Sequence, residues 1–157
     1  MQNKPPGMDA PWVPKLIKHM SRINVWVYRR TNGRVGGTWR VGAAFRKPVK
    51  LALLTHTGRK SGKEFTAPLL FLRDGENVVF VASQGGLPKN PQWYHNLVAT
   101  PECTVQVRSD VRRMVARTAT LPERAVLWPR LTGLYADFDS YQSWTEREIP
   151  VVICEPA

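Results

Sequence analysis

Residues 55–63 read THTGRKSGK and combine three cationic side chains with two glycines in one short connection. Cations crowded into one turn repel each other, so the pattern indicates that an anion binds there. Glycines allow backbone N–H groups to point toward one acceptor, while Arg59 and Lys60 add charge and Ser61 adds a hydroxyl donor. A solvent-exposed basic hairpin is the alternative that this segment alone leaves open.

The spacing of the same segment excludes a P-loop. That motif has four residues between its glycines, a Ser or Thr after its lysine, and a helix behind it. Here three residues separate Gly58 from Gly62, Glu64 follows Lys63, and the residues beyond have the composition of a strand.

Residues 82–97, ASQGGLPKNPQWYHNL, form a second candidate site. A glycine-rich loop here follows an apolar strand and precedes a helix, whose N-terminus also favours anions. Trp93 and Tyr94 offer flat faces to a planar ring, and Asn96 offers both a donor and an acceptor. The alternative places Trp93 in the core and makes Asn96 a cap.

Residues 134–144, LYADFDSYQSW, carry Tyr135, Phe138, Tyr141 and Trp144 at intervals of three. Aromatic residues at this spacing usually pack in a core, but they can also wall a pocket for a flat apolar substrate. The sequence has no Ser-His-Asp order, no carboxylate pair and no metal-ligand spacing. An enzyme of this kind would take its chemistry from a bound cofactor.

The length of 157 residues predicts one domain. Apolar runs separated by turn residues predict six strands, mostly joined as hairpins, with helices inserted, and therefore an antiparallel α+β barrel. We expect strands over residues 49–56, 65–72, 78–82, 104–108, 111–119 and 149–156, helices over 12–30, 91–98, 122–135 and 141–144, and turns at 74–75 and 109–110. We expect residues 1–47 to form a basic arm that ends in a glycine-rich linker over 31–47, and residues 48–157 to form the barrel domain.

The net charge of +11 is concentrated at the N-terminus, where residues 1–60 hold 13 Lys and Arg against one acidic residue. Such an arm fits an anionic membrane, a nucleic acid or an anionic ligand. Its helix has an apolar face (Val13, Leu16, Ile17, Met20, Ile23 and Val27) and a basic one (Lys15, Lys18, Arg22 and Arg29). The pattern is typical of a helix at a membrane interface, and a helix packed on its own domain is the alternative. No apolar run is long enough to span a bilayer.

Three segments together resemble the deazaflavin-dependent nitroreductase family, in the expected order and over nearly the whole chain: LLTHTGRKSG, ASQGGLPKNPQWYHNLVATPE and YQSWTEREIPVVICEP. The helix MSRINVWVYRR resembles the N-terminus of that family. The resemblance implies a split β-barrel related to flavin-reductase and pyridoxamine-oxidase-like folds. It also implies binding of coenzyme F420, an 8-hydroxy-5-deazaflavin whose tail carries a phosphate and glutamates. The family is actinobacterial; several members associate with the inner membrane face and reduce quinones, and some activate nitroimidazole prodrugs.

The resemblance also implies roles for particular residues. Arg59, Lys60 and Ser61 would hold the phosphate and the acidic tail. The other implied cofactor-binding residues are Pro68, Ser83, Gln84, Gly85, Gly86, Pro91, Gln92, Trp93 and Asn96. Tyr135 and Tyr141 match substrate-pocket tyrosines and would donate a hydrogen bond or a proton to the acceptor. The implied reaction is hydride transfer from the reduced deazaflavin to a quinone or a similar electron-poor acceptor.

The chain departs from the family pattern around the pocket. Leu70 and Phe138 stand where the best-known member of the family has pocket tyrosines, Gln84 replaces a lysine, and Phe65 and Ala67 replace an arginine and an asparagine. The pocket is therefore expected to be less polar. Quinone reduction should survive this change, whereas nitroimidazole reduction should be weak or absent.

Two other functions fit the same sequence. One is an F420-dependent reductase of an enone or a nitro compound, and the other is a non-enzymatic split barrel that holds a lipid or fatty acid. A nucleic-acid partner is not expected, because the body lacks interleaved aromatic and basic residues. Two cysteines favour a reduced, cytoplasmic setting, with peripheral binding at the inner membrane face as a further expectation. The oligomeric state stays open, since split barrels often dimerise.

Overall fold

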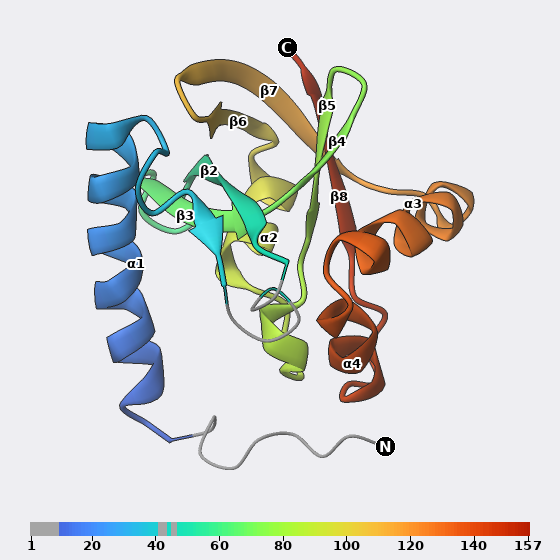
Figure 1. The fold of residues 1–157 in the computed structure, drawn as a ribbon. Coiled ribbons are helices and arrows are strands. Elements are labelled where there is room, and N and C mark those ends of the chain that lie inside the picture. The colour runs from blue at the N-terminus through green and yellow to red at the C-terminus, as the bar shows by residue number, and fades with distance from the viewer. Residues whose placement is uncertain (1–9, 41–43, 45–46) are drawn as a thin grey trace.

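The computed structural model describes residues 10–40, 44 and 47–157. Within those residues eight strands form one curled antiparallel sheet (Figure 1). The strands are β1 (Thr38–Trp39), β2 (Val49–Thr57), β3 (Glu64–Leu70), β4 (Leu72–Asp74), β5 (Asn77–Val81), β6 (Glu102–Val107), β7 (Asp110–Thr118) and β8 (Val151–Pro156). Their order is β1-β2-β6-β7-β8-β5-β4, and β3 pairs separately with β2. The predicted antiparallel α+β architecture is confirmed.

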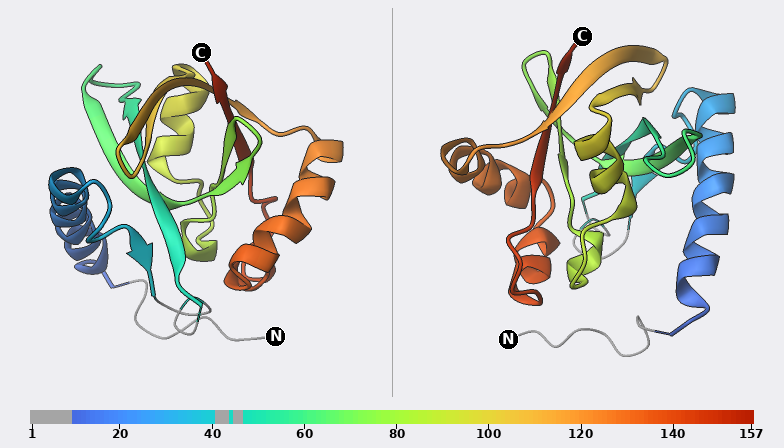
Figure 2. Two further views of the ribbon diagram at one scale, coloured as in Figure 1. Left: turned by 45° about the horizontal axis from the view of Figure 1, so that its top comes forward. Right: turned by 180° about the vertical axis from the view of Figure 1, so that it is seen from behind.

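Within the described residues four α-helices lie around this sheet: α1 (Val13–Thr31), α2 (Gln92–Ala99), α3 (Leu121–Leu134) and α4 (Asp137–Ser143). A short 3-10 helix, η2, covers Gln84–Gly86. Helix α1 stands on one side of the molecule, α3 and α4 lie on the opposite side, and α2 sits between them (Figure 2). Helix α3 begins with a capping box, in which the Thr120 hydroxyl accepts from the Glu123 amide and the Glu123 carboxylate accepts from the Thr120 amide.

Strand β5 is buried on both faces, which explains its uninterrupted apolar sequence. Val78 and Phe80 face a core that also contains Trp93 of α2, whose ring centroid lies 6.3 Å from that of Phe80. Val79 and Val81 face a second core covered by α3 and α4. Because successive strand residues point to opposite faces, one short strand joins both cores.

The N-terminal helix is tied to the sheet through its inner face. Val25 and Tyr28 pack with Leu51 and Leu53 of β2. The buried Tyr28 hydroxyl donates to the Leu51 carbonyl at 3.0 Å and accepts from the Arg108 amide at 2.7 Å. Helix α1 therefore packs on the domain through this face, whatever its outer face contacts.

The expectation of a linker over residues 31–47 was wrong at Thr38 and Trp39, which pair with β2 as strand β1. The glycines before them serve close packing: a side chain at Gly33 would approach the Tyr28 ring to 2.9 Å, and one at Gly37 would collide with the Gly33 carbonyl oxygen. A glycine-rich sequence can indicate tight contact as well as flexibility. Residues 41–43 and 45–46 of the expected linker lie outside the described residues.

Three smaller expectations were also wrong. The single strand expected over 65–72 is divided at Phe71, because β3 pairs with β2 whereas β4 pairs with β5 across the curl of the sheet. The turn after β6 is centred on Arg108 and Ser109, where Arg108 takes a left-handed φ of 55°. Helix α4 begins at Asp137 instead of residue 141.

Candidate cofactor and substrate site

Residues 58–63, here called the cationic turn, join β2 to β3. The Gly58 amide donates to the Lys63 carbonyl at 2.7 Å, and the Gly62 amide donates to the Gly58 carbonyl at 2.8 Å. The Ser61 hydroxyl accepts from the Lys63 amide at 3.3 Å. Gly62 has a φ of 70° that favours glycine. The turn is therefore closed by its own backbone and by the Ser61 hydroxyl, and these hydrogen bonds use none of its three cationic side chains.

The cations of this turn lack carboxylate partners. Arg59, Lys60 and Lys63 are exposed, and none forms an ion pair with a carboxylate of the described residues. Arg130, by contrast, pairs with Asp74 at 2.7 Å. Uncompensated like charges on a rigid turn favour a ligand that carries several negative charges.

Asn96 connects the cationic turn to α2. Its Oδ1 accepts from the Arg59 backbone amide at 3.2 Å and from Arg59 Nη1 at 2.9 Å. Its Nδ2 lies 3.1 Å from Nδ1 of His56 on β2. Both Asn96 and His56 are buried. Burial lowers the pKa of His56 to about 4, so its imidazole is neutral at physiological pH. The expected cofactor residues Arg59 and Asn96 are thus in direct contact.

The glycine-rich loop begins with Ser83 in the right-handed helical region and continues through three successive residues of positive φ: Gln84 at 47°, Gly85 at 61° and Gly86 at 75°. A right-handed residue followed by a left-handed one orients successive N–H groups toward one acceptor. At Gly86 a side chain would lie 2.8 Å from the Tyr141 carbonyl oxygen. The loop therefore requires glycine where it packs on α4.

Arg147 holds this loop, and sequence reasoning missed it. Its guanidinium donates to the carbonyls of Leu87 at 3.0 Å, Ala82 at 3.3 Å and Ser83 at 2.8 Å, and to Asn90 Oδ1 at 2.7 Å. The loop has few hydrogen bonds of its own, so one planar group satisfies carbonyls along its length. The segment TERE marks a charged site in the sequence, but nothing local pairs it with a loop about sixty residues earlier.

Tyr135 and Tyr141 form a hydroxyl pair with 3.2 Å between their oxygens. Tyr135 is buried, and Tyr141 on α4 is half-buried. Phe138 packs against both rings, with ring centroids 5.2 Å from Tyr135 and 6.4 Å from Tyr141. Burial raises the pKa of both tyrosines, so both hydroxyls keep their protons at neutral pH.

Trp39 of β1 is a second residue that sequence reasoning missed. Its indole Nε1–H donates to the Tyr135 hydroxyl at 3.4 Å. Ala44 is buried in the same core as Tyr135. The expected linker therefore contributes to the surroundings of an expected catalytic tyrosine.

The remaining expected residues lie on elements that border these groups. Strand β3 carries Pro68 and Leu70, both half-buried. Pro91 is buried just before α2, and Gln92 is the exposed first residue of that helix. Trp93 packs in the core with Phe80, as in the alternative that the sequence left open.

The cationic turn, α2, the glycine-rich loop and the tyrosine pair follow one another in contact, and this series is here called the band. Asn96, which contacts the cationic turn, lies five residues beyond Pro91, or about 7.5 Å along α2 from the end of the glycine-rich loop. That loop contacts α4 through Gly86, which lies against Tyr141. The cationic turn and the tyrosine pair are therefore joined through α2 and the loop.

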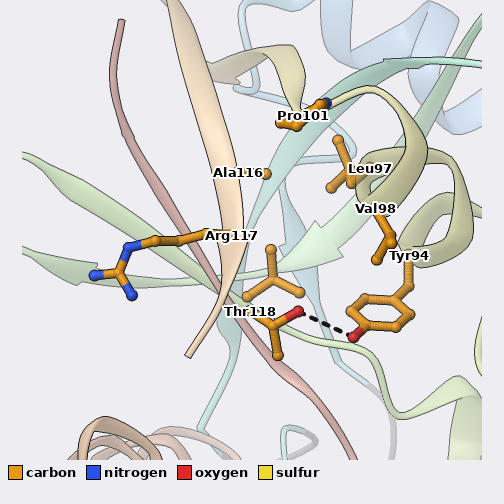
Figure 3. Close-up of a pocket in the computed structure, with 8 residues that line it drawn as sticks. Tyr94, Leu97, Val98, Pro101, Ala116, Arg117 and Thr118 are labelled. Carbon is orange, nitrogen blue, oxygen red and sulfur yellow. Dashed lines mark hydrogen bonds between the residues drawn. The ribbon is translucent and has the colours of Figure 1, made fainter. Parts of the chain in front are cut away.

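Two hollows of the described surface lie elsewhere. The larger, about 210 Å³, lies between α2 and β7 and is lined by Tyr94, Leu97, Val98, Pro101, Ala116, Arg117, Thr118 and Val152 (Figure 3). The smaller, about 50 Å³, lies beside Tyr28 and Arg108. Neither is lined by a residue of the cationic turn or of the tyrosine pair, but the larger one is lined by Tyr94, which the sequence offered with Trp93 as a flat face for a planar ring.

Residues 20–156 match the family model described as F420H(2)-dependent quinone reductase. The chain belongs to this family. The expected resemblance, the oxidoreductase class and coenzyme F420 as the cofactor are therefore confirmed.

Relatives in the F420H(2)-dependent quinone reductase family cover most of the chain. The Mycobacterium tuberculosis protein Rv3178, which carries the family's name, is 56% identical over 117 residues, or 74% of this chain and 98% of the relative. The F420H(2)-dependent quinone reductase Rv1261c of the same organism is 38% identical over 135 residues, or 84% of this chain and 87% of the relative.

Solved structures agree with the family assignment. An F420-H2 dependent reductase, FDR-A, has a TM-score of 0.63 and 39% identity, and covers 67% of this chain and 93% of its own. A structure described as a domain-swapped dimer has a TM-score of 0.65 and 31% identity, and covers 92% of this chain and 97% of its own. The expected split-barrel fold is confirmed.

Proposed function

We propose that the protein reduces a quinone-type acceptor beside Tyr141, with F420 held along the band from the cationic turn to the glycine-rich loop. Family membership supports the reaction class. The observation that carries the assignment of roles is the contact of Arg59 with Asn96, since it joins an uncompensated cationic turn to α2. That helix begins where the glycine-rich loop ends.

The residues of the cationic turn fit the anionic tail of the cofactor. Arg59 uses Nη1 and its amide for Asn96, which leaves its other guanidinium donors for a phosphate. Lys60 adds a mobile ammonium, and a charge-assisted hydrogen bond of this type contributes roughly 1.5–3 kcal/mol. The glycine-rich loop lets its backbone approach a planar ring closely at the half-buried Gly85, which carries no side chain, whereas Gly86 packs on α4.

The tyrosine pair supplies the proton of the reaction. Reduced F420, when bound, supplies a hydride. The acceptor also needs a proton, and Tyr141 is the half-buried member of the pair, whereas Tyr135 is buried. Tyr135 lies behind it at hydrogen-bond distance and can replace the proton that Tyr141 donates. Because the pKa values of both tyrosines are raised, both hydroxyls are protonated at neutral pH and can donate.

The pocket residues favour a quinone over a nitroimidazole. Leu70 of β3 and Phe138 of α4 are apolar, and the resemblance implies tyrosines at these two positions in the best-known member of the family. A flat, uncharged quinone tolerates such walls, whereas a nitro group loses potential hydrogen-bond donors.

A Lys60→Ala variant should bind F420 about tenfold more weakly than the wild type, a loss of ~1.4 kcal/mol. The reason is the removal of one charge that faces the anionic tail. Fluorescence titration of F420 with each purified protein measures the affinity. Lys50→Ala is the matched control, because Lys50 is an exposed lysine near the opposite end of β2 and should leave the affinity unchanged.

Two results would count against the proposal. Equal affinities of the wild type and Lys60→Ala would remove the role of the cationic turn. A folded wild type that does not bind F420 at micromolar concentration would remove the function itself.

We also propose that α1 binds an anionic membrane surface peripherally. Its outer face exposes Trp12, Leu16, Ile17, Met20, Ile23 and Trp26, with tryptophans 63% and 64% exposed near the two ends of this stretch. The exposed cations Lys15, Lys18 and Arg22 lie on the same helix, whereas Arg29 donates to the Thr66 hydroxyl of β3. Apolar side chains flanked by tryptophan and cations fit the headgroup region of an anionic bilayer. No helix of the described residues is both long and apolar enough to cross a membrane.

A Leu16→Asp/Ile23→Asp variant should lose binding to phosphatidylglycerol vesicles, at least tenfold in a co-sedimentation assay, because it places carboxylates at the anionic surface. Wild-type binding to phosphatidylcholine vesicles should be weak. Leu121→Asp is the matched control, since Leu121 is 68% exposed on α3 and should not affect binding. Unchanged vesicle binding by the double variant would contradict the proposal. If the wild type is a dimer and the double variant is a monomer, the outer face of α1 is instead an interface between two copies of the chain.

A further inference from the structure

The side-chain amide of Asn96 is bonded at both ends, and the two partners fix its orientation. Arg59 presents only N–H donors, from its backbone amide and from Nη1, so the atom that faces it is the amide oxygen. The amide NH2 must then face His56 Nδ1 at 3.1 Å. This arrangement requires Nδ1 to act as the acceptor and places the imidazole proton on Nε2.

His56 is built into the sheet beneath the cationic turn. It is 6% exposed on β2, two residues before Gly58, and its ring stacks on Phe65 of β3 with centroids 6.0 Å apart. Phe65 also closes the space above Gly58, where a side chain would approach its ring to 2.6 Å. A buried imidazole held in this way can orient Asn96, but it cannot reach the substrate that accepts the hydride.

We propose that His56 is a positioning residue, which orients Asn96 and thereby fixes Arg59 and the cationic turn for the anionic tail of the cofactor. This inference rests on the proposed function. It assigns His56 to recognition of the tail alone. The glycine-rich loop is instead held by Arg147, through hydrogen bonds that do not involve His56.

The test compares two variants with two ligands. His56→Leu removes the acceptor, whereas His56→Asn keeps an acceptor oxygen near the position of Nδ1. Affinity is measured for F420 and for its tail-free 8-hydroxy-5-deazaflavin riboside. His56→Leu should weaken F420 binding about tenfold and riboside binding less than twofold, and His56→Asn should recover most of the loss. A purely structural role would weaken both ligands equally.

Two further measurements need no cofactor. Nitrogen NMR shifts of the wild type should show His56 with an unprotonated Nδ1 and a protonated Nε2 at neutral pH. Hydrogen exchange of the Arg59 amide should be at least tenfold faster in His56→Leu, with exchange of the core amide of Val105 unchanged.

The outcomes separate this inference from the proposed function. A protonated Nδ1 at neutral pH, or an unchanged Arg59 exchange rate together with equal losses for both ligands, would overturn the role of His56. If wild type fails to bind F420 while Arg59 exchange still responds to His56→Leu, the positioning role stands and the proposed function fails.

Discussion

Replacing Gly86 with alanine is expected to lower the free energy of unfolding by about 3 kcal/mol and to abolish measurable F420 binding. Gly86 has a φ of 75°, which costs an alanine about 1 kcal/mol. Its new methyl group would also lie 2.8 Å from the carbonyl oxygen and 3.0 Å from the Cα of Tyr141. Both are backbone atoms of α4, which cannot rotate away as a side chain can. The collision is removed only if the glycine-rich loop moves away from the tyrosine pair.

Gly75→Ala is the matched control, because Gly75 has a similar φ of 61° in the β4–β5 turn and open space around it. Chemical denaturation should show a loss of only about 1 kcal/mol for this control. The difference between the two variants isolates the collision with α4. Similar losses for both, or normal F420 binding by Gly86→Ala, would mean that the loop does not depend on close packing against α4.

Replacing Arg147 with methionine is expected to cost about 3 kcal/mol in the free energy of unfolding and at least tenfold in F420 affinity. The change removes four donated hydrogen bonds from the loop between β5 and α2. Methionine has similar length and fills most of the space, so the loss reports mainly on the unsatisfied carbonyls. Denaturation and fluorescence titration of the same samples measure both effects.

Two comparisons sharpen this prediction. Arg130→Met removes one exposed pair with Asp74 and should cost less than about 1 kcal/mol. Arg147→Lys should recover little, because an ammonium cannot reproduce the planar fork that reaches several carbonyls together. Full recovery by lysine would show that charge alone, without the fork, holds the loop.

Much of the sheet could be predicted because its signals are local. The apolar runs of β5 and β8 and the turn at Gly75 can be recognised within a few residues of sequence, and their antiparallel pairing follows from short connections. The cationic turn and the glycine-rich loop were also visible locally, through residue types with few other uses. These local signals led to the correct fold class and to the correct family.

The missed residues act across long sequence separations. Trp39 and Tyr135 are 96 positions apart, and Arg147 bonds to carbonyls 60 to 65 positions away. No local pattern in a single sequence indicates that two residues so far apart are in contact. His56 carries no local signal for the same reason, since its partner Asn96 lies 40 positions later. Residue type indicated what each side chain could do, but only the fold determined what it faces.

The hydrogen bond from Trp39 to Tyr135 joins the amino-terminal segment to the chemistry of the protein. A shortened protein that began after residue 40 would keep every residue expected to bind F420, yet Tyr135 would lose an indole donor and part of its shelter from water. Contact with water would lower the pKa of Tyr135, whereas the loss of the indole donor would raise it, so both changes would act on its acidity. Tyr135 would therefore have different surroundings in long and short forms of this enzyme. A difference between their reduction rates could not be attributed to membrane attachment alone.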